Sequence, residues 1–230
     1  MLSDVLYAGE RFDVSLTLIN ASDLYNAYQD GQRNFLRSNL RLISLQEICL
    51  KSINFSQSDL TGAILTQVDL RHGILIETQL IAVDLWRSQL NHALLTQANL
   101  SRARLIRTNF SHADLHQAML TQADLRLACL QNADLSHANL IGADLRYADL
   151  RGANLAGADL SHADLTGACL ANADLYQAKL TKTIVTLAEL PSLSSSLPSS
   201  LSSSLSNPLA FLSTVSDTLS SCHGADFSSV

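Results

Sequence analysis

The sequence predicts an all-β solenoid, a chain that turns once every five residues around a tube lined by leucine. Three observations lead to this prediction. Leu or Phe occupies every fifth position from Phe35 to Leu180, thirty times in one register. The residue two positions earlier is Ala at every repeat from Ala113 to Ala178, and the residue directly before the Leu is usually Asp or Asn. Such small units cannot bury their apolar residues alone and need stacked neighbours.

A five-residue period fits neither regular element. On an α-helix, five residues advance about 500°, so successive Leu side chains would point to every side of the helix. On a continuous strand, alternate Leu side chains would point to opposite faces because five is odd. A backbone that turns once per repeat removes both conflicts, since every Leu then points to a common axis. The Ala shares this inward face because a narrow tube has no room for a second large side chain.

The tandem A(D/N)LXX units resemble the pentapeptide-repeat family, most clearly in the stretch ADLRYADLRGANLAGADL that begins at Ala143. The lead-in LYNAYQDGQRNFLRSNL is also similar to the helical cap that commonly opens such proteins. The resemblance implies a right-handed quadrilateral parallel β-helix with four repeats in each coil. Thirty repeats would then make a rod about 36 Å long, at a spacing of about 4.8 Å between neighbouring strands.

Composition divides the chain into three parts. Residues 1–33 are irregular and form an N-terminal extension with a capping helix. Residues 34–185 form the pentapeptide-repeat β-helix. Residues 186–230 are dominated by Ser, contain all three Pro of the chain and lack the register of five, so we expect a low-complexity, mostly disordered tail.

Both ends of the tube need a cap because coil edges carry unpaired backbone groups. At the first end, we expect Ser22 to cap a helix that starts at Asp23 and ends at Gly31. At the other end, the segment 181–190 is the expected cap. Coil ends that stay exposed would allow two rods to pair end to end as a homodimer.

Composition also indicates the setting of the protein. The chain is 47% hydrophobic but only 5% aromatic, so its core must be aliphatic. The net charge of −6 is mild and gives no signal for nucleic-acid binding. Asp4 and Glu10 interrupt the segment where a signal peptide would be apolar, and no window approaches eighteen apolar residues. We therefore expect a cytoplasmic protein without a membrane span, whose four scattered Cys are reduced thiols.

The sequence contains no recognisable catalytic or cofactor-binding motif. A Gly-rich phosphate loop, HExxH and GxSxG are all missing, and the Asp positions follow the repeat rather than a cleft. His72, His92 and His112 are spaced by twenty residues and could in principle hold zinc. Stacked coils would hold their side chains parallel rather than converging, which favours a polar surface ladder. The sequence thus predicts no enzyme, no cofactor and no metal site.

Outward side chains twenty residues apart should stack in columns, and one set of columns gathers aromatic residues and arginines. Trp, Tyr and Arg are enriched among interface hot spots, so this set is the predicted protein-interaction face. The alternative is a solvated face whose arginines balance the acidic residues beside them. The predicted face consists of Trp86, Arg87, Arg104, Ile106, Arg107, Arg126, Arg146 and Tyr147.

Ile74 and Leu94 occupy the position where most repeats carry Asp or Asn, and they are twenty residues apart. They should therefore form an exposed apolar pair. Exposed apolar patches can mark interaction sites, although two such residues are also ordinary on a protein surface.

The predicted function is that of a non-enzymatic interaction scaffold or regulatory binding module with a protein partner that the sequence does not identify. The resemblance implies an alternative as well. Some members of the family resemble B-form DNA in shape and charge, bind DNA gyrase and confer quinolone resistance, while others are regulatory interaction proteins in cyanobacteria. DNA mimicry needs a strongly negative rod. Between Phe35 and Val185, thirteen Lys and Arg balance thirteen Asp and Glu, which disfavours this alternative.

Overall fold

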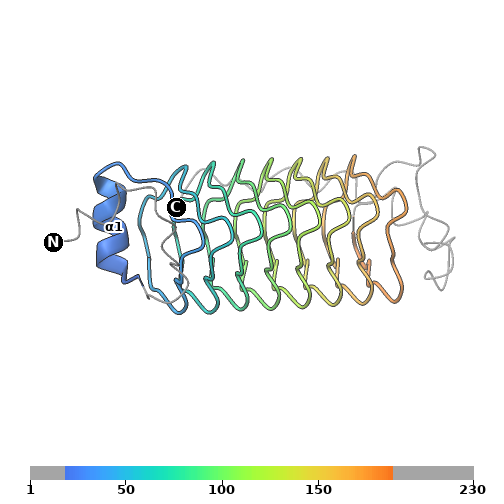
Figure 1. Ribbon diagram of the computed structural model, residues 1–230. Helices are drawn as coiled ribbons and strands as arrows, with labels where there is room; N and C mark the ends of the chain where they lie inside the picture. The colour runs from blue at the N-terminus through green and yellow to red at the C-terminus, as the bar shows by residue number, and fades with distance from the viewer. Residues whose placement is uncertain (1–18, 189–230) are drawn as a thin grey trace, which may run out of the picture.

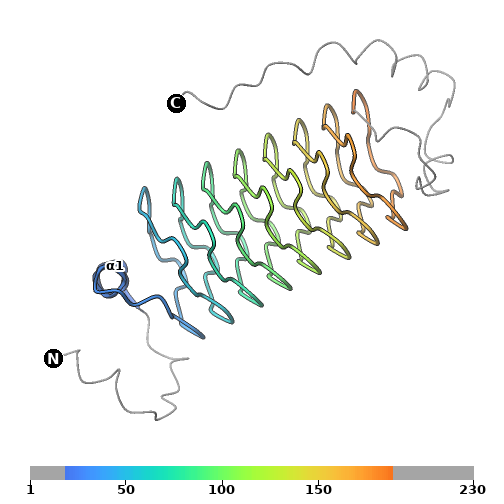
Figure 2. The ribbon, with the colours of Figure 1, turned by 90° about the horizontal axis from the view of Figure 1, so that it is seen from above.

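The structure is a computed structural model that describes residues 19–188, a helix followed by a rod of stacked coils (Figure 1). The helix α1 spans Ala21–Gln29 and lies across one end of the rod. From Asn34 to Ile184, the residue directly before each Leu forms a parallel β-bridge with the residue twenty positions away. Each bridge involves single residues, so no longer strand is formed in this range. Four repeats make one coil, and the coils follow one another along the rod (Figure 2).

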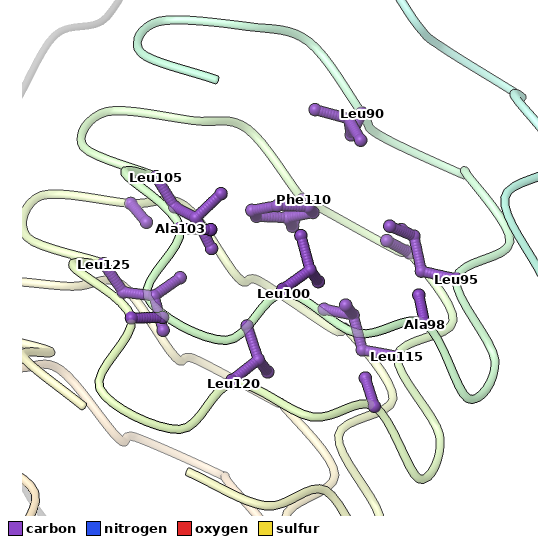
Figure 3. Packing of buried hydrophobic residues seen from close by; sticks show 14 of the residues in the cluster. Leu90, Leu95, Ala98, Leu100, Ala103, Leu105, Phe110, Leu115, Leu120 and Leu125 are labelled. Carbon is purple, nitrogen blue, oxygen red and sulfur yellow. The ribbon is translucent and has the colours of Figure 1, made fainter. Parts of the chain in front are cut away.

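The Leu and Ala rows fill the interior. Around Phe110, the Leu side chains of consecutive repeats point toward a common axis from different sides of the coil (Figure 3). Every Leu or Phe at a repeat centre from Leu40 to Leu180 is at most 3% exposed, and the Ala row from Ala113 to Ala178 is at most 5% exposed. Both rows therefore point inward, as the sequence predicts.

Several repeats carry a hydroxyl group in place of the inward Ala. The Thr78 hydroxyl is fully buried and donates a hydrogen bond to the Phe55 carbonyl at 2.9 Å. The buried Thr108 hydroxyl donates in the same way to the Leu85 carbonyl at 2.7 Å. A buried hydroxyl without a partner would be destabilising, so these bonds explain why the core accepts polar residues at this position.

Backbone hydrogen bonds hold each coil to its neighbours. In the repeat 145–149, the N–H groups of Leu145 and Tyr147 donate to carbonyls of the following coil at 2.8 and 2.9 Å. The N–H of Asp149 donates to the preceding coil at 2.9 Å. Three of the five N–H groups of the repeat thus link coils, and the pattern recurs along the rod.

The remaining two N–H groups of this repeat are satisfied within the turn. The Ala148 N–H donates to the Leu145 carbonyl at 3.0 Å and closes the turn. The Arg146 N–H donates to the Asp144 carboxylate at 3.2 Å, because the side chain of an Asp or Asn can accept from the backbone two residues later. An Asp or Asn before the Leu therefore has a structural role as well as facing outward. Its side-chain oxygen accepts the backbone N–H of the residue after the Leu, which has no backbone acceptor.

Each corner of the coil contains one residue with a left-handed backbone. We call the two residues after each Leu the first and second turn positions. The second turn position has a positive φ at every corner from Arg37 to Leu187, and most of these residues are not glycine. The non-glycine values lie between 52° and 62°. Such a conformation is disfavoured for L-residues, so the fold imposes it at each corner.

The capping helix differs in detail from the sequence prediction. Asn20, rather than Ser22, is the N-cap, and its side chain accepts the Asp23 N–H at 2.9 Å, so α1 begins at Ala21 and not at Asp23. Asn caps at least as well as Ser, and here it precedes Ser22 along the chain. Gly31 ends the helix as predicted. It has a φ of 94° and donates its N–H to the Tyr28 carbonyl at 3.1 Å.

The helix is fixed to the first coils by its buried face. Leu24 is fully buried and Tyr28 is 7% exposed. The Tyr28 hydroxyl donates to the Lys51 carbonyl at 3.1 Å, and the Arg33 guanidinium lies over the Tyr28 ring at 3.8 Å from its centroid. These contacts cover the first end of the apolar interior.

At the other end of the rod, the described residues continue the coil. Ile184 forms a bridge with Asp164, and Val185 and Ala188 pack partly buried against the core. The rest of the predicted cap, residues 189–190, and most of the predicted tail lie outside the described residues. End-to-end pairing of two rods stays a prediction.

The left-handed corners predict that glycine stabilises one position and destabilises its neighbour. Ala82 occupies a second turn position with a φ of 54°, so Ala82→Gly should stabilise the protein by about 0.5 kcal/mol because Gly adopts positive φ without strain. Ala171 occupies a first turn position, where no positive φ occurs, and Ala171→Gly should destabilise by about 0.5–1 kcal/mol. Urea midpoints of the two variants measure both effects. Shifts of the same sign would contradict the prediction.

Candidate functional site

Trp86 stands at a first turn position on one side of the rod, where its backbone N–H donates to the Asp84 carboxylate at 3.0 Å. Its indole ring is half-buried and flanked by two arginines. The guanidinium carbon of Arg87 lies 4.7 Å from the ring centroid, and that of Arg104 lies 5.8 Å away. Both distances fit cation–π contacts, which hold the arginines beside the indole.

Arginines at the first turn position are paired with the Asp of their own repeat. Arg126 Nε and Nη2 donate to the two carboxylate oxygens of Asp124 at 2.8 and 2.7 Å. Arg146 binds Asp144 in the same bidentate way, at 2.8 and 2.6 Å. Bidentate Arg–carboxylate pairs are specific in geometry, so the charges of these two arginines are compensated inside the protein.

These pairs join into a ladder of alternating charge along the rod. Arg126 Nε also lies 3.6 Å from Asp144, and Arg146 Nε lies 3.9 Å from Asp164. Burial alone would raise the pKa of Asp144, but the hydrogen bonds from Arg146 hold it below its ordinary value. The Asp144 hydrogen bonds in turn raise the pKa of Arg146. Asp144 and Arg146 are therefore both ionised at neutral pH.

Arg87 and Arg107 differ from the other arginines of this side. Both occupy second turn positions, one coil apart in the same column. Within residues 19–188, neither forms an ion pair, whereas Arg104 is bound to Asp84 at 2.8 Å. Two like charges in neighbouring coils repel each other.

The structure therefore brings only part of the predicted interaction face together around the two arginines that form no ion pair within the described residues. Trp86, Arg87, Arg104, Ile106 and Arg107 lie on two adjacent coils of one side, and we call these five residues the Trp86 surface. Ile106 is half-buried in the column of Trp86. The other three predicted residues lie further along the same side of the rod.

Tyr147 is separated from the Trp86 surface by its position and its packing. It is 59% exposed, in the column of Arg87 and Arg107 but two coils beyond Arg107. A Cβ atom at Gly167 would lie 2.6 Å from the Tyr147 ring, which shows that the ring lies over this glycine of the next coil. The ring therefore packs in the direction away from Trp86.

The predicted apolar pair lies on the opposite side of the rod. Ile74 and Leu94 form a parallel bridge, and Leu94 is 41% exposed while Ile74 is half-buried. Their positions are ten residues, or two sides of the coil, away from those of Asp84 and Arg104. A partner that contacts the Trp86 surface with one segment would not reach this pair at the same time.

The three histidines form a stack. The rings of His72 and His92 are 5.1 Å apart and inclined by 8°, and those of His92 and His112 are 5.0 Å apart and inclined by 3°. Parallel rings direct their nitrogens side by side rather than toward one point, as a zinc ion would require. Among residues 19–188, no group of three His, Cys, Asp or Glu is placed to hold a metal.

Sequence reasoning found the columns and gave the balancing of arginines by neighbouring acidic residues as an alternative, but it did not identify which Asp each Arg binds. The signal is the triplet Asp-Leu-Arg, in which the Asp before the Leu binds the Arg after it. The triplet occurs four times, and the bidentate pair forms each time, at Arg71, Arg126, Arg146 and Arg151. An Arg in this context is neutralised locally and is a weak candidate for partner binding.

Comparison with known families identifies the repeat. The family described as pentapeptide repeats matches this chain with eight copies, in the segments 38–75, 48–87, 88–126, 128–167 and 143–181. The matched segments span more than half of the chain. The chain belongs to the pentapeptide-repeat family. Its four-sided coils are the right-handed quadrilateral β-helix that the resemblance implied.

Several solved pentapeptide-repeat structures are similar to this chain. HetL of the cyanobacterium Nostoc, involved in heterocyst differentiation regulation, is 31% identical over 74% of this chain and 94% of its own, with a TM-score of 0.29. Rfr23 of the cyanobacterium Cyanothece is 22% identical over 74% and 97%, with a TM-score of 0.28. QnrB1, a plasmid-mediated fluoroquinolone resistance protein, is 17% identical over 77% and 99%, with a TM-score of 0.37. A comparison with curated proteins finds no match.

Two further features of this pentapeptide-repeat protein concern its surroundings. Among the described residues, no helix has the length and apolar character needed to cross a membrane. Cys49, Cys129 and Cys169 are present as thiols rather than disulfides, and Cys222 lies outside the described residues.

The Asp-Leu-Arg pairing predicts a pH-dependent loss of stability. Burial raises the pKa of Asp149, but hydrogen bonds from Arg151 and Gln131 lower it below the ordinary value of 3.8. The charge of Asp149 therefore stabilises the folded protein above about pH 3.8, and this contribution is lost as the pH falls through the folded-state pKa. Asp149→Asn should cost about 0.5–1 kcal/mol at pH 7 and progressively less below pH 4.

Thermal unfolding between pH 7 and pH 3 measures this difference. Asn keeps an oxygen that can accept the Arg151 N–H, so the variant removes the charge and leaves the turn intact. Asp134→Asn is the matched control, because Asp134 accepts the Ser136 N–H at 2.9 Å and forms no ion pair within residues 19–188. An Asp149→Asn deficit that persists unchanged at pH 3 would contradict the assignment.

Proposed function

We propose that this protein is a non-enzymatic scaffold or regulatory binding module that binds a partner protein through the Trp86 surface. The observation that supports the proposal is the combination of the only Trp of the chain with two arginines that have no counter-charge in the described structure. The expected cytoplasmic location belongs to the same proposal.

The chemistry of the surface suits protein recognition. Trp and Arg are the residues that most often dominate binding energy at protein interfaces. A half-buried indole offers a large contact area, and its flanking arginines are already oriented by cation–π contacts. The backbone below is fixed by hydrogen bonds to both neighbouring coils. A partner would therefore bind a rigid surface and lose little additional entropy.

The interior argues for binding rather than catalysis. Leu and Ala side chains fill the centre of the coils, so any reactive group must stand on the convex outside of the rod. Carboxylates on that outside mostly cap their own turns or bind a neighbouring arginine. Catalytic groups usually need a concave site that excludes water.

Replacing Trp86 and Arg107 should abolish partner capture and leave the fold intact. The tagged protein and its Trp86→Ala/Arg107→Ala variant are compared by affinity capture from extracts of the native cells with quantitative mass spectrometry. Both side chains stand outside the core, so circular dichroism should be unchanged. Arg126→Gln/Arg146→Gln is the control on the same side, and it should retain the partner. Equal capture by the first variant and the unaltered protein would show that another face is used.

The alternative, a DNA mimic that inhibits or protects DNA gyrase, has one supporting observation. Asp114, Asp134 and Asp174 share one column and form no ion pair within residues 19–188. Their number is small, however. B-form DNA carries one negative charge for about every 1.7 Å of its length, whereas the rod from Phe35 to Val185 has a formal charge of zero.

We therefore expect the purified protein to leave gyrase supercoiling unchanged at micromolar concentration. An assay of DNA supercoiling with the full chain measures this directly. Inhibition that disappears when the three aspartates are replaced by Asn would support the mimic instead of the scaffold.

A further inference from the structure

The Trp86 surface also indicates the chemistry of the partner. We propose that the partner presents an acidic protein segment, in which two carboxylates bind Arg87 and Arg107 while an apolar side chain packs on Trp86 and Ile106. This inference rests on the proposed function, because it assigns a partner chemistry to the same surface.

Arg87 and Arg107 have hydrogen-bond donors without acceptors in the described chain. At the same corner position, Arg37 and Arg102 each donate to the Gln that stands twenty residues further along, at 2.8 and 3.3 Å. The residue twenty beyond Arg87 is Arg107, and the residue twenty beyond Arg107 is Leu127. Neither side chain can accept a hydrogen bond. The order of residues in this column therefore leaves two neighbouring guanidinium groups for an external acceptor.

Carboxylates on one protein segment match this pair in spacing. Arg87 and Arg107 stand in adjacent coils, whose backbones are about 4.8 Å apart. Two acidic residues three or four positions apart on a helix have Cβ atoms about 5–6 Å apart. Each guanidinium can bind one carboxylate through two parallel hydrogen bonds. One turn of an acidic helix would therefore satisfy both arginines at once.

The surroundings favour a protein over a nucleic acid. Phosphate binding depends on many cations along the strand, whereas only two arginines of this surface lack a counter-charge. Asp84 and Asp124 stand in the column beside Trp86, and their ion pairs with Arg104 and Arg126 leave these two arginines less available to a phosphate backbone. Ile106 instead offers an apolar contact suited to a side chain.

Trp86 fluorescence can report binding, because Trp86 is the only Trp of the chain and Arg87 lies over its ring. The full chain is titrated with an Ala-rich helical peptide that contains two Glu four residues apart and one Leu. Trp86 emission and the heat of binding are recorded. We expect a saturable change with the Glu peptide, and binding about tenfold weaker when both Glu are replaced by Gln.

Two matched variants locate the binding. Arg87→Gln/Arg107→Gln should weaken the Glu peptide about tenfold and remove the difference between the Glu and Gln peptides. Arg126→Gln/Arg146→Gln removes the same charge from the same side and should bind the Glu peptide as the unaltered protein does. This contrast separates the two uncompensated arginines from the general charge of the face.

The inference is overturned if the Gln peptide binds as tightly as the Glu peptide, or if both variants weaken binding equally. It is also overturned if single-stranded oligothymidylate binds more tightly than the Glu peptide, or if neither emission nor heat responds to any peptide. The capture experiment stays independent of these outcomes. A cellular partner that is lost with Trp86→Ala/Arg107→Ala, together with failure of the acidic peptide, leaves the proposed function standing and removes only the acidic partner.

Discussion

The left-handed residue at each corner is the constraint on which the rest of the structure depends. It recurs every five residues from Arg37 to Leu187, at an intrinsic cost of roughly 1–2 kcal/mol for each non-glycine residue. Each corner brings one Leu to the axis, and burial of a Leu side chain contributes about 1.5–3 kcal/mol. Bonds between coils form only if every corner is present, because one missing turn would shift all later repeats. The stability of the fold therefore depends on the summed contributions of many similar repeats.

Much of this fold could be predicted from the sequence because its period is so regular. The Leu and Ala rows require a common inward face, and the resemblance supplied four sides. The left-handed corner was not predicted, although the residue types at the two turn positions indicate it. No Val, Ile, Thr or Pro occurs at the second turn position, while Thr and Ile are common at the first. β-Branched residues avoid positive φ, so the left-handed backbone explains why they do not occur at this position. The Asn20 cap was missed because Asn and Ser compete as neighbouring candidates.

The candidate site was harder to predict than the fold. Columns follow from the period of five together with the four sides that the resemblance implied, so the position of Trp86 among arginines could be predicted. Whether an arginine is paired depends on whether its guanidinium can contact a carboxylate, and this differs between the first and second turn positions. Arg126 and Arg146 lie within reach of their own Asp, whereas Arg87 and Arg107 stand at the corner with no carboxylate bound. A surface rich in arginine can thus be largely neutral, and only its corner residues stay available to a partner.

The bridge spacing of twenty residues determines which side of the rod each repeat lies on, in addition to the length of the rod. Adding one five-residue unit would leave the core unchanged but rotate every later column by one side of the coil. An insertion between Arg87 and Arg107 would therefore separate them without unfolding anything. An insertion before Trp86 or after Arg107 would keep the pair intact. Gains and losses of single repeats beyond the coils that contact the capping helix then keep the Leu and Ala rows inward, yet they preserve recognition only outside the coils that bind. In such a protein, a change in the number of repeats also changes which side chains lie side by side on the surface.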